Sequence, residues 1–186
     1  MTCIVGIELS GPERVLIAGD SAGVSGTDLE DRLDEKVFAV GPFVVGIAGC
    51  FRMGQILRYR WKPPEHQNGV DATAFMVRDV VESLRRCFLD NGTRFNGPSG
   101  DSHSGQFLMG YRGNLYKVDS DFQVGRSRLG YAAVGSGSRV ALGALHALTV
   151  SAEDQTTRAR MAMIAAAQHD SAVRAPFVFL EGGRLP

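Results

Sequence analysis

The chain has 186 residues, of which 44% are hydrophobic and 22% are charged, which is enough to bury one sizeable core. Its 20 basic and 20 acidic residues cancel, so charge gives no reason to expect nucleic acid or an anionic membrane as a partner. No apolar run approaches the roughly 18 residues of a membrane span, and the start lacks a basic region followed by an apolar one, so we expect a cytoplasmic protein. The three cysteines, Cys3, Cys50 and Cys87, lack paired spacing and are expected to be reduced.

The first fifty residues are typical of β-strands. β-branched and apolar runs occupy residues 3–8, 15–18, 37–40 and 43–47. Gly-Pro pairs at residues 11–12 and 41–42 separate these runs and predict hairpin turns.

The next segment is predicted to be helical. Residues 51–61 favour a helix that stops before Pro63 and Pro64. Asp71 is a candidate N-cap for a long helix whose apolar residues recur every three or four positions and which ends near Asn91. Residues 91–105 are rich in Gly, Ser and Asn and predict a mobile loop.

The remaining elements complete an α+β order. Strands are predicted at 106–111 and 114–118, helices at 138–149 and after a cap at Ser151, and a last strand at 176–180. This order suits two sheets packed face to face with helices outside, a four-layer αββα sandwich. Because neither an internal repeat nor a linker is visible, we expect residues 1–186 to form a single domain.

The start of the chain carries the strongest chemical signal. A methionine aminopeptidase normally removes Met1 when a small residue follows, and Thr2 would then carry both a hydroxyl and a free α-amine. A threonine hydroxyl needs a neighbouring base, and an α-amine with a pKa of roughly 7.7 to 8 suits that task. A lysine nearby would lower the pKa of the amine, and an aspartate would hold the lysine charged. Asp20 and Lys36 supply these two groups.

Five sequence blocks resemble proteasome β-type subunits, including the bacterial HslV peptidase. In the order of that family they are Thr2-Cys-Ile-Val-Gly-Ile, Val15-Leu-Ile-Ala-Gly-Asp20, Lys36-Val-Phe, Val44-Val-Gly-Ile-Ala-Gly49 and Ala133-Val-Gly-Ser-Gly137. Asp20 and Lys36 are 16 positions apart, as in the family. The resemblance implies the four-layer fold of an N-terminal nucleophile (Ntn) hydrolase and a threonine-type endopeptidase activity.

The resemblance also implies roles for further residues. Gly46 matches the glycine whose backbone N–H stabilises the oxyanion, and Ser136 and Asp170 match the residues that position the nucleophile's amine. Val44 and Ala48, which alternate with Gly46, would line a primary specificity pocket for an apolar side chain. The chain departs from the family at Val173, where a serine is expected, and after Asp20, where many subunits carry a basic residue.

The resemblance implies partners as well. Family members hydrolyse peptides or unfolded proteins and assemble as stacked rings, so we expect a homo-oligomeric ring, and the resemblance allows an ATPase unfoldase as a partner. The apolar residues of the two helices predicted around residues 51–90 exceed one stripe and suggest an interface. No cofactor is implied, and because His66, His103 and His146 lack ligand spacing, no metal site is expected.

Competing interpretations remain open at this stage. Asp20 could be an ordinary turn residue, Lys36 a solvated strand end and Gly46 a β-bulge. The chain could also be a catalytically silent ring or scaffold subunit. A third alternative is a serine esterase that uses Ser21, because residues 19–23 match the G-x-S-x-G pattern. That alternative requires a helix directly after the serine and a suitably placed histidine, which the sequence does not offer.

Overall fold

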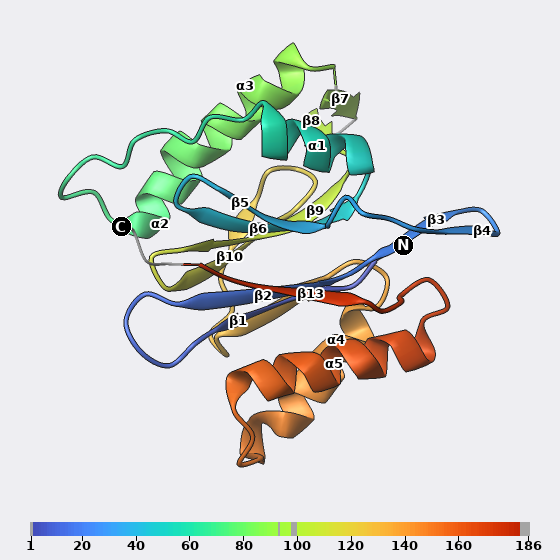
Figure 1. The fold of residues 1–186 in the computed structure, drawn as a ribbon. Helices are drawn as coiled ribbons and strands as arrows, with labels where there is room; N and C mark the ends of the chain where they lie inside the picture. Colours follow the sequence, from blue (N-terminus) through green and yellow to red (C-terminus); the bar gives the residue numbers. More distant parts are fainter. Residues whose placement is uncertain (1, 93, 98–99, 183–186) are drawn as a thin grey trace.

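The computed structural model describes residues 2–92, 94–97 and 100–182 and shows two β-sheets stacked face to face (Figure 1). The four-stranded sheet has the order β12-β1-β2-β13, formed by Tyr131–Val134, Ile4–Glu8, Val15–Asp20 and Phe177–Gly182. The five-stranded sheet has the order β11-β10-β9-β6-β5, formed by Val124–Gly125, Asn114–Val118, Gly105–Tyr111, Phe43–Gly49 and Val37–Val40. All neighbouring strands in both sheets are antiparallel.

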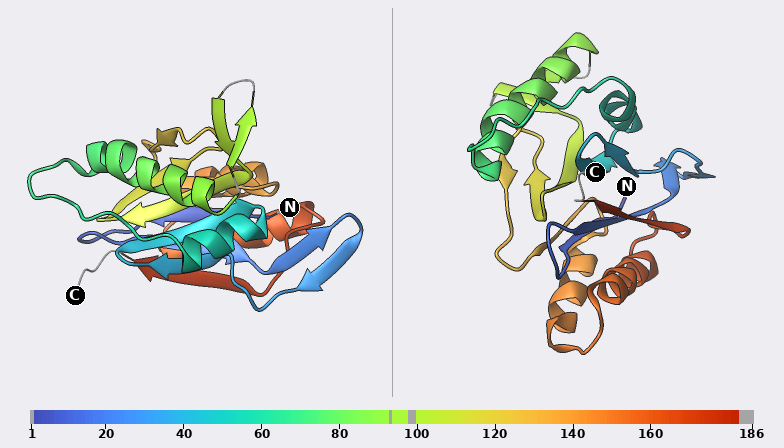
Figure 2. Two further views of the ribbon diagram at one scale, coloured as in Figure 1. Left: turned by 90° about the horizontal axis from the view of Figure 1, so that it is seen from above. Right: turned by 60° about the vertical axis from the view of Figure 1, so that its left-hand side comes forward.

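Helices cover the outer face of each sheet, so the four-layer αββα arrangement is confirmed (Figures 1 and 2). The five-stranded sheet is covered by α1 (Phe51–Tyr59), α2 (Ala72–Phe75), the π-helical turn η1 (Met76–Val80) and α3 (Val81–Asp90). The four-stranded sheet is covered by α4 (Ser138–Ala147), the 3₁₀ turn η2 (Leu148–Val150) and α5 (Gln155–His169). In the described part of the chain, no helix is long and apolar enough to span a membrane.

The space between the sheets is filled by small and branched side chains. Its buried members are Ile4, Val15, Ile17, Val37, Val44, Ala48, Leu108, Leu115 and Val134. Glycine allows the two sheets to approach closely at one point, because a Cβ added to Gly46 would lie only 2.5 Å from Cγ2 of Ile4. The side chains of β6 that point toward this space are therefore core residues.

Several predicted element boundaries need correction. Residues 91–105 contain a hairpin of β7 (Arg94–Gly97) and β8 (Gly100–His103) in place of the predicted loop. A second hairpin, β3 (Ala22–Ser25) with β4 (Asp28–Asp31), projects from the body where no strand was predicted (Figure 2). The cap of α5 is Asp154 and not Ser151, because its carboxylate accepts hydrogen bonds from the backbone N–H groups of Thr156 and Thr157.

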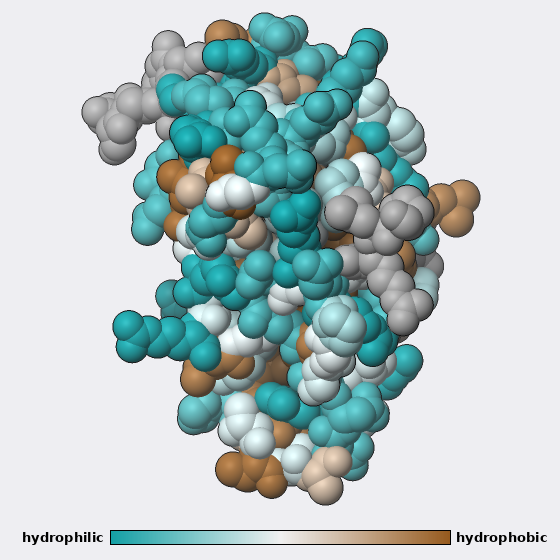
Figure 3. Space-filling model, turned by 90° about the vertical axis from the view of Figure 1, so that its left-hand side faces the viewer, coloured by the Kyte–Doolittle hydropathy of each residue, from teal (hydrophilic) through white to brown (hydrophobic). Residues whose placement is uncertain are grey.

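Most of the apolar residues that exceed one stripe on the helices around residues 51–90 are buried within the chain. Trp61, Val80, Val81 and Leu84 are buried against the five-stranded sheet, and the indole of Trp61 donates a hydrogen bond to Ser83. On the face drawn in Figure 3, hydrophobic residues are scattered among hydrophilic ones. Tyr59 and Val77 of this surplus, at 71% and 53% exposure, are left to contribute to an interface, and assembly has to be tested directly.

Buried His103 should make the stability of the fold depend on pH. Its ring lies among Phe88, Phe107 and Phe122, with Nε2 2.9 Å from the carbonyl oxygen of Asp119, and burial lowers its pKa. Below about pH 6.5 the unfolded chain gains a proton on this residue that the folded chain resists, so the free energy of unfolding should fall by up to about 1.4 kcal/mol per pH unit.

Urea unfolding between pH 5 and 8 would measure this effect, with the variant His103→Phe as the comparison. The wild type should lose stability more steeply than the variant as the pH falls below 6.5, since the other histidines are common to both proteins. Parallel pH dependences would contradict the prediction.

Candidate active site

The ends of three strands bring Thr2, Asp20 and Lys36 together at one end of the sandwich. Thr2 precedes β1 and Asp20 ends β2, and these strands pair so that Ile4 lies opposite Gly19. The backbone N–H of Asp20 donates to the carbonyl of Cys3, and Lys36 directly precedes β5 in the other sheet. The start of β1 accordingly lies at the end of the sandwich where the β3–β4 hairpin leaves the body (Figure 1).

Asp20 and Lys36 form a buried ion pair. The ammonium of Lys36 lies 2.9 Å from both carboxylate oxygens of Asp20, and the side chains are 2% and 0% exposed. The same carboxylate accepts hydrogen bonds from the backbone N–H groups of Cys3 at 2.9 Å and Ala22 at 3.2 Å. Burial lowers the pKa of Lys36, while the charge of Asp20 opposes that shift. Lys36 is therefore not a solvated strand end, and Asp20 does more than close its own turn.

The turn between β12 and α4 holds the backbone of Thr2. Ser136 Oγ accepts a hydrogen bond from the Thr2 N–H at 3.2 Å and donates to the Thr2 carbonyl at 3.4 Å. The N–H of Gly137 also donates to that carbonyl, at 3.2 Å. Gly135 has a φ of 95°, and a Cβ there would collide with the Thr2 carbonyl. Thr2 itself is only 3% exposed.

Asp170 lies at the C-terminal end of α5, close to the same group of residues. Its carboxylate accepts a hydrogen bond from the backbone N–H of Ala172 at 2.9 Å. Burial, followed by the charges of Asp20 and Asp170, raises the pKa of the neighbouring Cys3 thiol to about 12. Cys3 therefore stays a neutral thiol. Val173, which replaces the serine expected from the family, is fully buried under α5.

Comparisons with known proteins place this geometry on a known fold. Neither a family model nor a curated protein matches the sequence. Among solved structures, BPH of Thiobacillus denitrificans aligns with a TM-score of 0.79 and 22% identity over 100% of both chains. BPH in complex with epoxomicin has a TM-score of 0.79 and 23% identity over 98% of this chain and 100% of that one. Eukaryotic HslV from Trypanosoma brucei has a TM-score of 0.69 and 17% identity over 98% of this chain and 100% of that one.

This chain has a proteasome/HslV-like fold. The expected fold is thereby confirmed, whereas identities of 17–23% carry no information on which side chains act. Whether the proteasome-like fold carries a working site depends on the geometry of this chain's own residues.

Gly46 is not placed as an oxyanion donor in this proteasome-like fold. Ile47 donates its N–H to the carbonyl of Lys36 at 2.9 Å, toward β5. Successive N–H groups of a strand point to opposite sides, so the N–H of Gly46 is directed into the ladder with β9, where Gly46 pairs with Leu108. The same alternation directs the N–H of Gly49 away from β9, past the first residue of β5. Gly49 therefore suits the role better, and counting in twos from Ile47 would have identified it.

Val44 and Ala48 do not line a pocket. They are 2% and 5% exposed and belong to the core between the sheets. The alternating residue Ile47 faces the helices and lines a hollow of about 100 Å³. The hollow's other lining residues are Asp34, Glu35, Phe38, Phe51, Gly54, Gln55, Arg58 and Tyr59. The alternation in the sequence was correctly recognised, but it was assigned to the wrong face of the strand.

Ser21 does not have the surroundings of an esterase nucleophile. Ser21 is 7% exposed, and its hydroxyl donates a hydrogen bond to the carbonyl of Pro176 at 2.7 Å. Within the described residues, no histidine forms a hydrogen bond with Ser21, and strand β3 follows where the esterase pattern requires a helix. Nor do the described residues include a group of three or more His, Cys, Asp or Glu side chains that could hold a metal ion.

Proposed function

We propose that this chain is a threonine-type endopeptidase whose nucleophile is Thr2, exposed by removal of Met1. The observation that carries the proposal is the buried Asp20–Lys36 ion pair, whose carboxylate accepts a hydrogen bond from the backbone N–H of Cys3, the residue that follows Thr2. A buried ion pair contributes little net stability, because desolvation offsets most of its attraction. A site that keeps a lysine charged next to a hydroxyl and an amine instead serves chemistry at that hydroxyl.

The proposed mechanism uses the chain's own groups. The α-amine of Thr2 accepts the hydroxyl proton while Oγ attacks the scissile carbonyl carbon, and the carbonyl electrons move to the oxygen. We propose the N–H of Gly49 as the donor to that oxyanion, in place of Gly46. Collapse of the intermediate expels the amine product, which takes the proton, and leaves an ester on Thr2. Water then hydrolyses this ester. Lys36 and Asp20 stabilise developing negative charge, and Ser136 and Asp170 position the Thr2 backbone.

Removal of Met1 provides the direct test. With Met1 attached, the nitrogen of Thr2 is an amide and accepts no proton, so only the processed chain should hydrolyse a fluorogenic peptide. Intact mass should show the loss of Met1 in the active preparation. Epoxomicin, which is bound in the related BPH complex, should inhibit the processed chain. A processed, folded chain that is inactive on a broad peptide library would favour a silent ring or scaffold subunit instead.

The hollow beside Ile47 is the proposed primary specificity pocket. Its floor consists of Phe38 and Ile47, which are each 4% exposed, so it offers an apolar surface to the side chain before the scissile bond. It also adjoins the active centre, because Glu35 precedes Lys36 in the chain and Ile47 bonds to the Lys36 carbonyl. A medium-sized apolar side chain fits a hollow of about 100 Å³.

We also propose that the chain assembles as a homo-oligomeric ring in the cytoplasm, with peptides or unfolded proteins as substrates. The likeness to BPH and HslV supports this proposal. Light scattering at micromolar concentration should show a particle of many subunits. A strict monomer with full peptidase activity would contradict the ring and leave the threonine chemistry unaffected. Co-purification with an ATPase would be the test of an unfoldase partner.

A further inference from the structure

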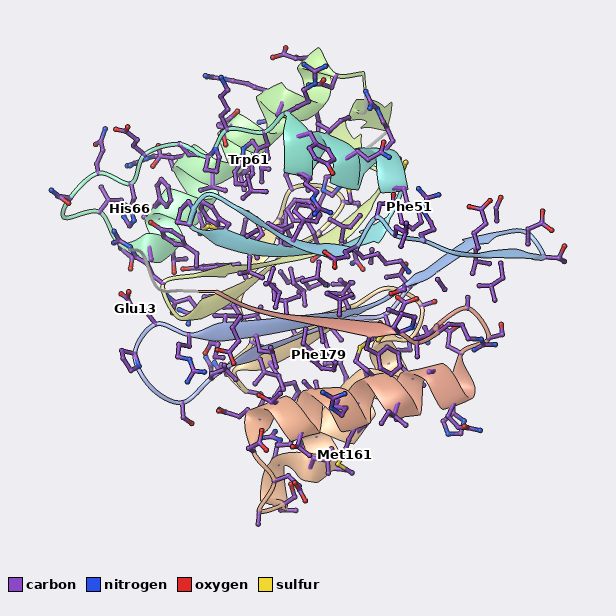
Figure 4. The ribbon with its side chains drawn as sticks, viewed as in Figure 1. Glu13, Phe51, Trp61, His66, Met161 and Phe179 are labelled. Atoms are coloured by element: carbon purple, nitrogen blue, oxygen red, sulfur yellow. The ribbon has the colours of Figure 1, made fainter. Side chains whose placement is uncertain are left out.

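Phe51, the first residue of α1, stands between two hollows at the active-site end of the fold (Figure 4). The smaller hollow, the proposed specificity pocket, is floored by Phe38 and Ile47. The larger one measures about 330 Å³ and lies against the β3–β4 hairpin, lined by Gly23, Val24, Ser25, Asp28, Glu30, Arg32 and Phe51. Among the described residues, Phe51 is the one that lines both.

Arg32, which directly follows the β3–β4 hairpin, holds the Phe51 ring in place. The guanidinium of Arg32 lies 4.2 Å from the ring centroid, a distance typical of a cation–π contact. Arg32 is itself fixed, because its Nε and Nη2 donate to the two carboxylate oxygens of Asp34 at 2.7 and 2.6 Å. The stem of Arg32 also packs against Gly23 of β3, where an added Cβ would lie 2.5 Å from Cδ.

Phe51 is also close to the reacting groups. Its ring centroid is 5.8 Å from the ammonium of Lys36, so the ring borders the proposed active centre as well as both hollows. A peptide bound with its scissile bond at Thr2 would therefore meet the ring with the side chain that enters the smaller hollow.

We propose that Phe51 is a specificity-determining partition, which confines the substrate side chain to the smaller hollow with its apolar floor and closes off the larger one, which is lined by Asp28 and Glu30. The inference rests on the proposed peptidase function, because it assigns the substrate class of that site. With the partition in place, medium-sized apolar side chains such as leucine are preferred, and long basic side chains are excluded.

Removal of the ring should join the two hollows. An arginine side chain could then lay its methylene stem over Phe38 and Ile47 and carry its guanidinium to the carboxylates of Asp28 and Glu30. Asp28 has no ion-pair partner among the described residues, and Glu30 is held only at 3.6 Å by Arg32, which is already bonded to Asp34. The joined cavity thus adds the carboxylates of Asp28 and Glu30 to those of the smaller hollow, where Asp34 is already bonded to Arg32.

The test measures binding, so that it is independent of turnover. All proteins carry Thr2→Ala to keep the peptide intact, and fluorescein-labelled peptides that differ only in one residue, leucine or arginine, are titrated by fluorescence anisotropy. The parent should bind the leucine peptide more tightly. Phe51→Ala should shift the ratio of the two Kd values toward arginine by roughly 10-fold or more, the scale expected for a changed pocket. Adding Glu30→Gln should reverse part of that shift.

Two further variants keep the result interpretable. Arg32→Gln leaves the ring in place but unbraced and should shift the ratio in the same direction by a smaller factor. Leu89→Ala, an exposed apolar residue of α3, is the matched control and should leave the ratio unchanged. An unchanged ratio in Phe51→Ala and Arg32→Gln overturns the partition, as does the absence of measurable binding of either peptide. Failure of the peptidase proposal would appear separately, as the absence of Thr2-dependent hydrolysis by the processed wild type.

Discussion

Thr2→Ala should reduce peptide hydrolysis by a factor of about 10⁴ or more, while the protein stays folded. The variant lacks the hydroxyl that forms the acyl-enzyme, whereas the backbone contacts of Thr2 with Ser136 and Gly137 do not involve its side chain. Steady-state hydrolysis of a fluorogenic peptide, with circular dichroism to confirm folding, measures the effect. Thr2→Ser retains a hydroxyl and should retain substantial activity.

Ser21→Ala is the matched comparison for the alternative nucleophile. It should keep much of the activity, because the Ser21 hydroxyl is engaged with the Pro176 carbonyl and contributes a single hydrogen bond. Loss of that bond should cost about 1 kcal/mol of stability. If Ser21→Ala were inactive and Thr2→Ala active, the N-terminal nucleophile would be refuted and the esterase alternative revived.

Lys36→Ala should cost both activity and stability. Activity should fall by several orders of magnitude, roughly 10³-fold, because a charge positioned at the reacting centre is lost. Without Lys36 the carboxylate of Asp20, which is 0% exposed, becomes an unpaired buried charge, and breaking such a pair costs about 3–5 kcal/mol. A lysine at a solvated strand end would have cost almost nothing, so the buried position changes the expectation for folding.

A double variant separates the two effects. Lys36→Met with Asp20→Asn removes both charges and keeps one acceptor oxygen, for the N–H of either Cys3 or Ala22, which bond to different oxygens of Asp20. Urea unfolding should show that the double variant recovers part of the stability lost in Lys36→Ala, while peptide hydrolysis stays low. Near-wild-type activity in a folded Lys36→Ala protein would remove Lys36 from the mechanism.

The sequence predicted best where local chemistry decides the structure. Asp71 does cap a helical stretch that runs to Asp90, since a cap needs only an acceptor two or three residues before free N–H groups. The β3–β4 hairpin was missed because its strands are only four residues long, carry few large apolar side chains and pair only with each other. Ser151 was preferred to Asp154 because both fit the start of α5, and only the packing of the turn selects one.

The residue types of the site were predictable from the sequence, whereas the directions in which the side chains and N–H groups of β6 point were not. Thr2, Asp20 and Ser136 lie together as expected, since each follows from the order of blocks along the chain. The assignments to Gly46, Val44 and Ala48 failed for a shared reason. A strand's alternation divides its residues into two faces, but the identity of the buried face depends on the second sheet, which is distant in sequence. In β6 that sheet covers the even-numbered residues.

The hydrogen bonds from the β12–α4 turn to Thr2 can form only late in the synthesis of the chain. An aminopeptidase needs a free, extended end, whereas in the fold Thr2 is 3% exposed and is held by Ser136 and Gly137. Those residues leave the ribosome on the order of ten seconds after Thr2, at ordinary rates of synthesis. Strand β1 also lacks its neighbour β12 until then. The order of the strands along the chain thus leaves an interval in which an aminopeptidase can reach Met1, and under the proposed function a chain that folds with Met1 still attached should stay inactive.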